Sequence, residues 1–126
     1  MIKRQNIIWV CTVFLIIGLF IVSCQTESGD VCDQKSGPAI YSVTASPTED
    51  EQVTLINCGD SQADISNWTL GDLNDPDTYD IPSGTILGPM EKKTFPHTTL
   101  NFQINDSGEV IYLKDNMGNT IDTWSN

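Results

Sequence analysis

Residues 109–124 read EVIYLKDNMGNTIDTW, and this stretch decides the fold class. Val110–Leu113 is apolar on both faces of an extended chain, which is typical of a central strand covered on both sides. The turn-forming residues Asp115–Asn119 separate it from a second extended run, Thr120–Trp124. Asp, Asn and Gly between two such runs favour a reversal of the chain. We therefore predict an antiparallel hairpin that joins residues 109–114 to residues 120–124.

The rest of residues 38–126 repeats this pattern of short extended runs between turn residues, without a sustained helical period. Besides the hairpin, the runs that we predict as strands are 40–45, 52–57, 67–70, 78–81, 85–87, 93–95 and 101–104. In the last of these, Phe102 and Ile104 continue an alternation that starts at Leu100. Many short strands between turns indicate an all-β domain, an antiparallel sandwich or barrel.

The alternation of apolar residues breaks where the run at residues 67–70 begins. Ile65 and Trp68 are three residues apart, so they cannot share one face of a regular strand. This spacing predicts a bulge or a turn at Ser66–Asn67.

The charge of the chain excludes one large class of function. The 126 residues carry a formal charge of -11. Residues 24–126 hold all 17 acids and only four lysines, without arginine, which leaves -13 on this part. Such a surface repels phosphate backbones, so we expect no nucleic-acid partner.

The first 24 residues are typical of an export signal. Lys3 and Arg4 precede the apolar run 7–22, IIWVCTVFLIIGLFIV. Ile21–Cys24 resembles the bacterial lipobox, in which a small residue precedes a cysteine. This resemblance implies lipid transfer to the Cys24 sulfur and cleavage before Cys24. The alternative is an uncleaved membrane-spanning helix, although such a helix takes about 20 apolar residues.

The lipobox prediction divides the chain into three parts. Residues 1–23 are a cleaved lipoprotein signal peptide, residues 24–37 a lipidated flexible tether, and residues 38–126 the β domain. Two or three acyl chains such as palmitate hold a protein stably on a membrane where a single chain does not. We therefore expect a lipid-anchored protein of the bacterial cell envelope, in the outer membrane, facing the periplasm or the surface.

The cysteines of the exported part allow one disulfide. Cys11 lies in the removed segment and Cys24 carries the lipid, which leaves Cys32 and Cys58. An oxidising compartment favours a bridge between these two, worth roughly 3 kcal/mol of stability. Two free thiols are the alternative. Neither cysteine has a histidine close in sequence, so we expect no zinc site or catalytic thiol here.

Three stretches of the β domain form a characteristic set: residues 51–57 with 65–70 (EQVTLIN and ISNWTL), residues 81–89 (IPSGTILGP) and residues 108–122 (GEVIYLKDNMGNTID). In this order and with these gaps, they resemble the lamin tail domain. The resemblance covers residues 38–126 and implies an immunoglobulin-like antiparallel β-sandwich with Trp68 in its core. It brings no catalytic residues, and it implies an extracytoplasmic accessory module. Cys58 departs from the family, where a small polar loop residue is more usual.

One acidic loop is a candidate calcium site. Asp72, Asn74, Asp75, Asp77 and Asp80 offer oxygen ligands, and Ca²⁺ takes six to eight oxygens. The spacing is not that of an EF-hand. The alternative is a solvated turn, because Asp and Asn are turn formers. We expect no other cofactor.

The sequence gives no sign of an enzyme. His97 is the only histidine, and we expect it to be exposed in a loop. No Gly-x-Ser-x-Gly turn is present that would make a serine a nucleophile. Trp124 lies two residues from the end of the chain, where it either closes the sandwich or stands exposed as a platform for a ligand.

These observations together predict a lipid-anchored, non-catalytic binding or adaptor module of the cell envelope. We expect the membrane to be reached through the lipid, and an envelope protein or a glycan to be the partner. The alternatives are a purely structural acidic component of the surface, a calcium-binding surface module, and a small hydrolase accessory.

Overall fold

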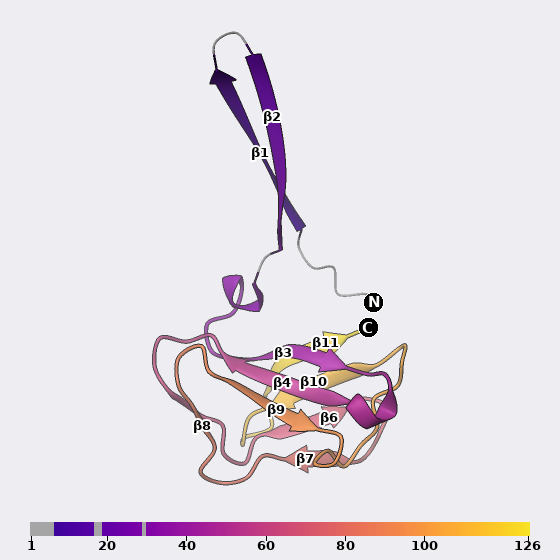
Figure 1. Cartoon of the computed structure of the whole chain (residues 1–126). Helices are drawn as coiled ribbons and strands as arrows, with labels where there is room; N and C mark the ends of the chain where they lie inside the picture. Colours follow the sequence, from indigo (N-terminus) through magenta and orange to yellow (C-terminus); the bar gives the residue numbers. More distant parts are fainter. Residues whose placement is uncertain (1–6, 17–18, 29) are drawn as a thin grey trace.

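The computed structural model describes residues 7–16, 19–28 and 30–126, with side chains for residues 30–126 (Figure 1). Within these residues, the elements are β1 (Ile7–Ile16), β2 (Leu19–Ser28), η1 (Val31–Asp33), β3 (Pro38–Thr44), η2 (Thr48–Asp50), β4 (Gln52–Asn57), β5 (Ala63–Asp64), β6 (Thr69–Asp72), β7 (Thr78–Asp80), β8 (Ile86–Leu87), β9 (Lys92–Pro96), β10 (Val110–Lys114) and β11 (Thr120–Ser125). The two elements written η are single 3₁₀ turns.

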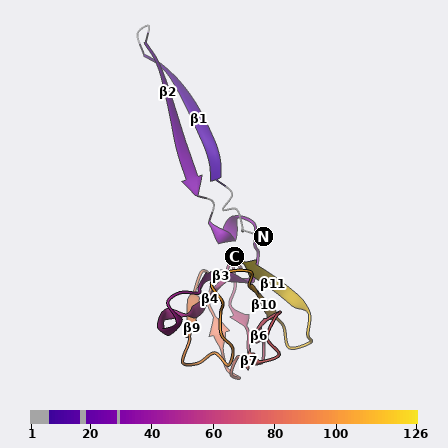
Figure 2. The same cartoon turned by 90° about the vertical axis from the view of Figure 1, so that its right-hand side faces the viewer.

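β1 and β2 pair antiparallel in a hairpin that stands apart from the other strands in Figures 1 and 2. Their register places Cys24 opposite Cys11. The predicted cleavage site before Cys24 therefore lies inside β2, and cleavage there stays a prediction. In the described part of the chain, no helix has the length and apolar character that crossing a membrane would need.

The remaining strands form an immunoglobulin-like antiparallel β-sandwich, as the sequence predicts. One sheet has the order β11-β10-β6-β7 and the other β3-β4-β9, and Figure 2 shows them as two layers. β5 and β8 pair separately as a short ladder. β11 neighbours β3 along one side of the sandwich. On another side, the rings of Tyr79 on β7 and Phe95 on β9 lie 5.6 Å apart and link the two sheets.

β10 is the central strand that the sequence predicts. It lies between β11 and β6, and it forms the predicted hairpin with β11. Ile111 and Leu113 are fully buried in the core, while Tyr112 and Lys114 lie half-buried on the opposite face. Burial of aliphatic side chains at about 25 cal/mol per Å² is the main stabilising term of such a core.

The predicted break at Ser66–Asn67 is a turn in the structure. Asn67 has φ 61°, in the left-handed region that Asn adopts more readily than most residues. The hydroxyl oxygen of Ser66 accepts hydrogen bonds from the amides of Gly84 and Thr85, at 2.8 and 3.2 Å. The turn allows both Ile65 and Trp68 to pack against the core.

The predicted strand at residues 101–104 is wrong. This segment joins no sheet, although Leu100, Phe102 and Ile104 are buried as their alternation suggests. The reason is visible at Ile104, whose amide donates to the buried carboxylate of Glu51 at 3.2 Å rather than to a neighbouring strand. A side chain thus satisfies the backbone where a sheet ladder otherwise would.

Tyr112 occupies the space above Gly71. The two residues face each other across the β10–β6 pair. A Cβ atom on residue 71 would lie 2.3 Å from the Tyr112 hydroxyl oxygen and 2.4 Å from its Cζ atom. Any larger residue at position 71 must therefore displace the ring.

We predict that Gly71→Ala lowers the free energy of unfolding by about 1–3 kcal/mol, because it overpacks this contact. Urea unfolding measures the change. Gly37→Ala is the matched control, since a Cβ there meets nothing within 4 Å. In a Tyr112→Ala background, Gly71→Ala should lose most of its cost, and an undiminished cost would contradict the assignment.

Candidate functional site

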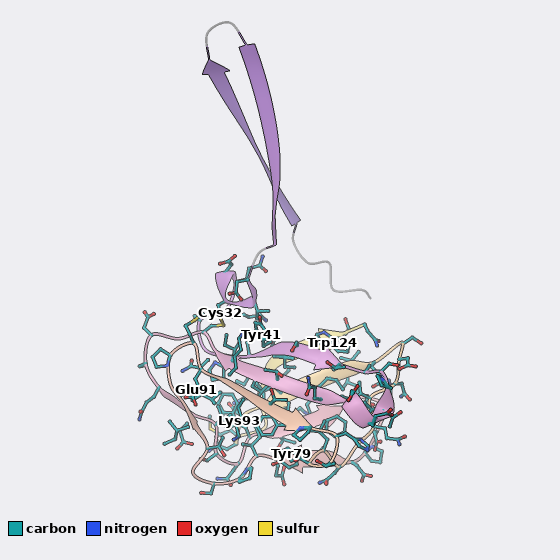
Figure 3. The ribbon with its side chains drawn as sticks, in the orientation of Figure 1. Cys32, Tyr41, Tyr79, Glu91, Lys93 and Trp124 are labelled. Atoms are coloured by element: carbon teal, nitrogen blue, oxygen red, sulfur yellow. A yellow bond between two sulfur atoms is a disulfide. The ribbon has the colours of Figure 1, made fainter. Side chains whose placement is uncertain are left out.

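The segment before β3 is fastened to the sandwich by a disulfide. Cys32, in η1, is bonded to Cys58, which follows β4, with an S–S distance of 1.99 Å and a Cα–Cα distance of 5.1 Å. The amide of Cys58 also donates to the Gly37 carbonyl at 3.0 Å. Figure 3 shows Cys32 on the segment between the β1–β2 hairpin and the sandwich. This is the pairing favoured from the sequence, and it ties part of the predicted tether to the domain.

Asp122 on β11 holds the same segment by its carboxylate. Oδ1 accepts from Lys35 Nζ at 2.6 Å, and Oδ2 accepts from the amide of Ile40 on β3 at 2.9 Å. The amide of Thr123 donates to Oδ1 as well. The Asp122 side chain is only 4% exposed. A buried carboxylate costs several kcal/mol unless it is paired and hydrogen-bonded, and these contacts meet that need.

Between this segment and the sandwich lies an open hollow of about 340 Å³, lined by residues 34–38, Trp68 and Ile121. Trp68 is half-buried: it packs against the core and also reaches the hollow. Ile121 is 39% exposed. Gln34 and Ser36 contribute exposed polar side chains. The hollow thus combines an apolar wall with a polar one.

Trp124 takes the closing role of the two that the sequence left open. It is half-buried and packs against the core from β11, opposite Ile111 on β10 (Figure 3). Trp124 and Asp122 share the inward face of β11, because residues two apart in a strand point the same way.

The calcium hypothesis for the loop at residues 72–80 is not supported by the geometry. Among residues 30–126, no three His, Cys, Asp or Glu side chains converge on a position where they could hold a metal ion. Three of the four carboxylates among the five candidates accept hydrogen bonds within the protein. Asp72 accepts from the amide of Asn74 at 2.8 Å, Asp75 from the amide of Asp77 at 2.8 Å, and Asp80 from the Thr69 hydroxyl at 3.1 Å. These bonds are those of a turn, and calcium binding by this loop stays a prediction from the sequence.

His97 lies in the turn after β9, against a buried carboxylate. Its amide donates to the Glu51 carbonyl at 2.7 Å, and its Nδ1 atom lies 3.6 Å from Glu51 Oε2. Glu51 is 3% exposed and also holds the amide of Ile104. Glu51 thus bonds both ends of the segment that runs from the end of β9 to residue 104, which is a structural role.

A buried carboxyl pair was missed by the sequence reasoning. Glu109 is 1% exposed, Asp72 is 2% exposed, and the two carboxyl groups can share a hydrogen bond once Glu109 carries a proton. Asn105 donates its side-chain amide to Glu109 Oε1. Burial, then the hydrogen bond with Asp72, raise the pKa of Glu109. Protonated Glu109 can donate through Oε2, which is buried and otherwise has no partner.

A signal for this pair was present in the sequence. Glu109 is two residues before Ile111 and four before Leu113, so the strand phase places all three on the inward face. Asp122 is found by the same reasoning, because it lies opposite Leu113 in the hairpin. An acid that falls in the apolar phase of a strand indicates a buried carboxyl group that needs partners.

Comparison with known families gives one clear result. The family model described as Lamin Tail Domain matches residues 33–126. The match takes in the last residue of η1, β3 and every later strand, so it includes all the residues that line the hollow and the Asp122 contacts. Among curated proteins, none matches the chain significantly.

We predict that Asp122→Ala lowers the free energy of unfolding by about 1–3 kcal/mol, since it leaves the buried amide of Ile40 without an acceptor. The matched variant Lys35→Ala removes only the partly exposed side of the ion pair and should cost about 1 kcal/mol or less. Urea unfolding of both variants tests the ranking. Equal costs for the two would show that the Ile40 bond is not the important contact.

We predict that Glu109→Gln makes the free energy of unfolding of the domain less sensitive to rising pH. The folded-state pKa of Glu109 is raised above its ordinary value, so its stabilising contribution is complete below that ordinary value and is lost as pH rises through the raised pKa. Gln keeps the donor to Asp72 and cannot ionise. The urea midpoint of the unmodified protein should therefore fall relative to that of the variant as pH rises above the ordinary pKa of a glutamate.

Asp115→Asn serves as the control of opposite sign. A side-chain hydrogen bond from Asn119 lowers the pKa of Asp115, so its contribution is present above the unfolded pKa and is lost as pH falls. If Glu109→Gln followed the same pH trend as Asp115→Asn, the assignment of a raised pKa to Glu109 would be wrong.

Proposed function

Because the chain belongs to the lamin tail domain family and its sandwich is fastened to the segment that leads to Cys24, we propose that it is a lipid-anchored, non-catalytic module of the bacterial cell envelope that presents this domain to a protein or glycan partner. The observation that carries the proposal is the double attachment of that segment through Cys32 and Asp122. A module that displays a binding surface benefits from such an attachment, because an ordered surface loses less conformational entropy on binding.

The attachment shortens the linker to the membrane. With lipid on Cys24, free chain extends only to Cys32, eight residues further on. At full extension these residues span about 28 Å. The proposed anchor therefore keeps the sandwich near the membrane surface, whereas a tether running freely to residue 37 would allow a wider range of positions.

Processing would also change the N-terminal hairpin. Cleavage before Cys24 removes β1, which is the only strand paired with β2 in the described residues. The residues of β2 that remain, up to Ser28, then have no pairing partner. They are polar and small, as suits a linker.

The charges of the domain favour an orientation away from the membrane. The -13 of residues 24–126 is repelled by anionic lipid headgroups. All four lysines of this part have intramolecular partners: Lys35 pairs with Asp122, and Lys92, Lys93 and Lys114 lie 3.5, 5.9 and 4.5 Å from the ring centres of Tyr41, Phe95 and Tyr112. The hold on the membrane is therefore assigned to acyl chains on Cys24.

The proposal of a non-catalytic role is supported by how the candidate groups are used. His97 faces Glu51, Glu109 shares its hydrogen bond with Asp72, and Asp122 holds Lys35 and a backbone amide. Each of these groups therefore faces another part of the domain.

We predict that Cys24→Ser moves the protein expressed in a bacterial host from the membrane fraction to the soluble fraction, because the sulfur that accepts the lipid is lost. Fractionation followed by immunoblotting measures the change. The double variant Cys32→Ser/Cys58→Ser is the control, since it keeps Cys24 and should stay with the membrane. Persistence of Cys24→Ser in the membrane would contradict lipid anchoring.

The partner is sought by crosslinking in intact cells followed by co-purification of the lipidated chain. A protein or glycan that co-purifies with the native chain and is lost with Asp122→Ala supports the binding role. Recovery of nothing beyond the chain itself favours the purely structural alternative.

A further inference from the structure

We propose that the hollow beside Trp68 binds an uncharged saccharide. This inference rests on the proposed function, since it names the chemistry of the partner. The hollow measures about 340 Å³, at the small end of the roughly 300–1,000 Å³ typical of ligand pockets. It has room for roughly one or two sugar rings rather than for a larger ligand.

The lining matches the two sides of a sugar ring. A pyranose has an apolar face of C–H groups and a rim of hydroxyls. Trp68 and Ile121 supply an apolar wall, and the exposed polar side chains of Gln34 and Ser36 lie on the other wall. An aromatic side chain that is half-buried against the core presents its remaining surface in a fixed position, which limits the entropy lost when a ligand stacks on it.

The charges around the hollow argue against an ionic ligand. Lys35 is the charged side chain among the described residues that line it, and its Nζ atom lies 2.6 Å from the Asp122 carboxylate. A bound anion would have to compete with this buried carboxylate, and it would approach a domain of charge -13. A cation would compete with Lys35 itself. A neutral, hydroxyl-rich ligand competes with neither the carboxylate of Asp122 nor the ammonium group of Lys35.

The shape of the hollow depends on the disulfide. Residues 34–38 form one wall, and they lie between two fixed points, the Cys32–Cys58 bond and the bond from the Ile40 amide to Asp122. Loss of the disulfide frees the start of this wall, while the Lys35–Asp122 ion pair and the bond from the Cys58 amide to the Gly37 carbonyl still hold the rest of it. The wall is therefore most firmly fixed in an oxidising compartment, which agrees with the proposed export of the protein.

The test is saturation-transfer NMR on the detergent-purified full chain with four neutral probes: maltose, cellobiose, lactose and N,N′-diacetylchitobiose. We expect saturable binding of at least one of them. Ile121→Ala and Gln34→Ala should each weaken that binding by about tenfold, the effect of losing one apolar or hydrogen-bonding contact. Ile86→Ala is the matched control, because Ile86 is 48% exposed on β8 and does not line the hollow.

A second comparison tests the role of the wall without altering the ligand contacts. Cys32→Ser/Cys58→Ser should bind the same probe at least about tenfold more weakly, with its β signature in circular dichroism retained. No saturable binding of any probe overturns the inference, and so does binding that Ile121→Ala and Gln34→Ala leave unchanged. If the crosslinked partner described above is nevertheless recovered, the proposed function stands and only the saccharide site is wrong.

Discussion

The carboxylate of Asp122 is the contact on which the closed side of the sandwich depends. It lies on β11 and bonds the amide of Ile40 on β3, so it joins the two sheets where they meet. It also holds Lys35, which brings the N-terminal segment onto the same edge. A charge that is 4% exposed is tolerated only with such partners. The same requirement that stabilises the edge therefore fixes the wall of the hollow.

Asp122 is one case of a wider use of acids in this chain. Glu51 accepts the amide of Ile104, Asp115 accepts the amides of Met117 and Asn119, and Asp72 accepts the amide of Asn74. Carboxylates that accept several backbone amides replace ladder bonds where the chain leaves a sheet. Part of the acidic excess thus has a structural cause.

The strands could be predicted from the sequence because apolar side chains alternate along a strand according to which of its faces is buried. Val110–Leu113 lies in the centre of its sheet, and the phase break at Ser66–Asn67 is a turn, both as predicted. The alternation of apolar side chains does not show which groups bond the backbone. Residues 101–104 were therefore predicted as a strand, although they have buried side chains without being one. The two-residue strand β5 was too short to carry a period.

The candidate site was harder to predict, because it depends on contacts between distant parts of the chain. Cysteine arithmetic favoured the Cys32–Cys58 bond, but it gave no sign that Lys35 would meet Asp122, 87 residues away. The family resemblance implied that Trp68 lies in the core, but it could not show that one side of Trp68 reaches a hollow. Such features form only when the N-terminal segment docks.

The position of the hollow restricts where its ligand can be. Its wall, residues 34–38, belongs to the segment that leads back to Cys24, so the hollow lies on the side of the sandwich where the proposed anchor enters. With about 28 Å of free linker at most, a ligand there must be close to the membrane. A polymer that stays far from the lipid could not reach it. The acidic charge repels the domain from anionic headgroups, and the space that this leaves between domain and membrane is accessible to an uncharged chain.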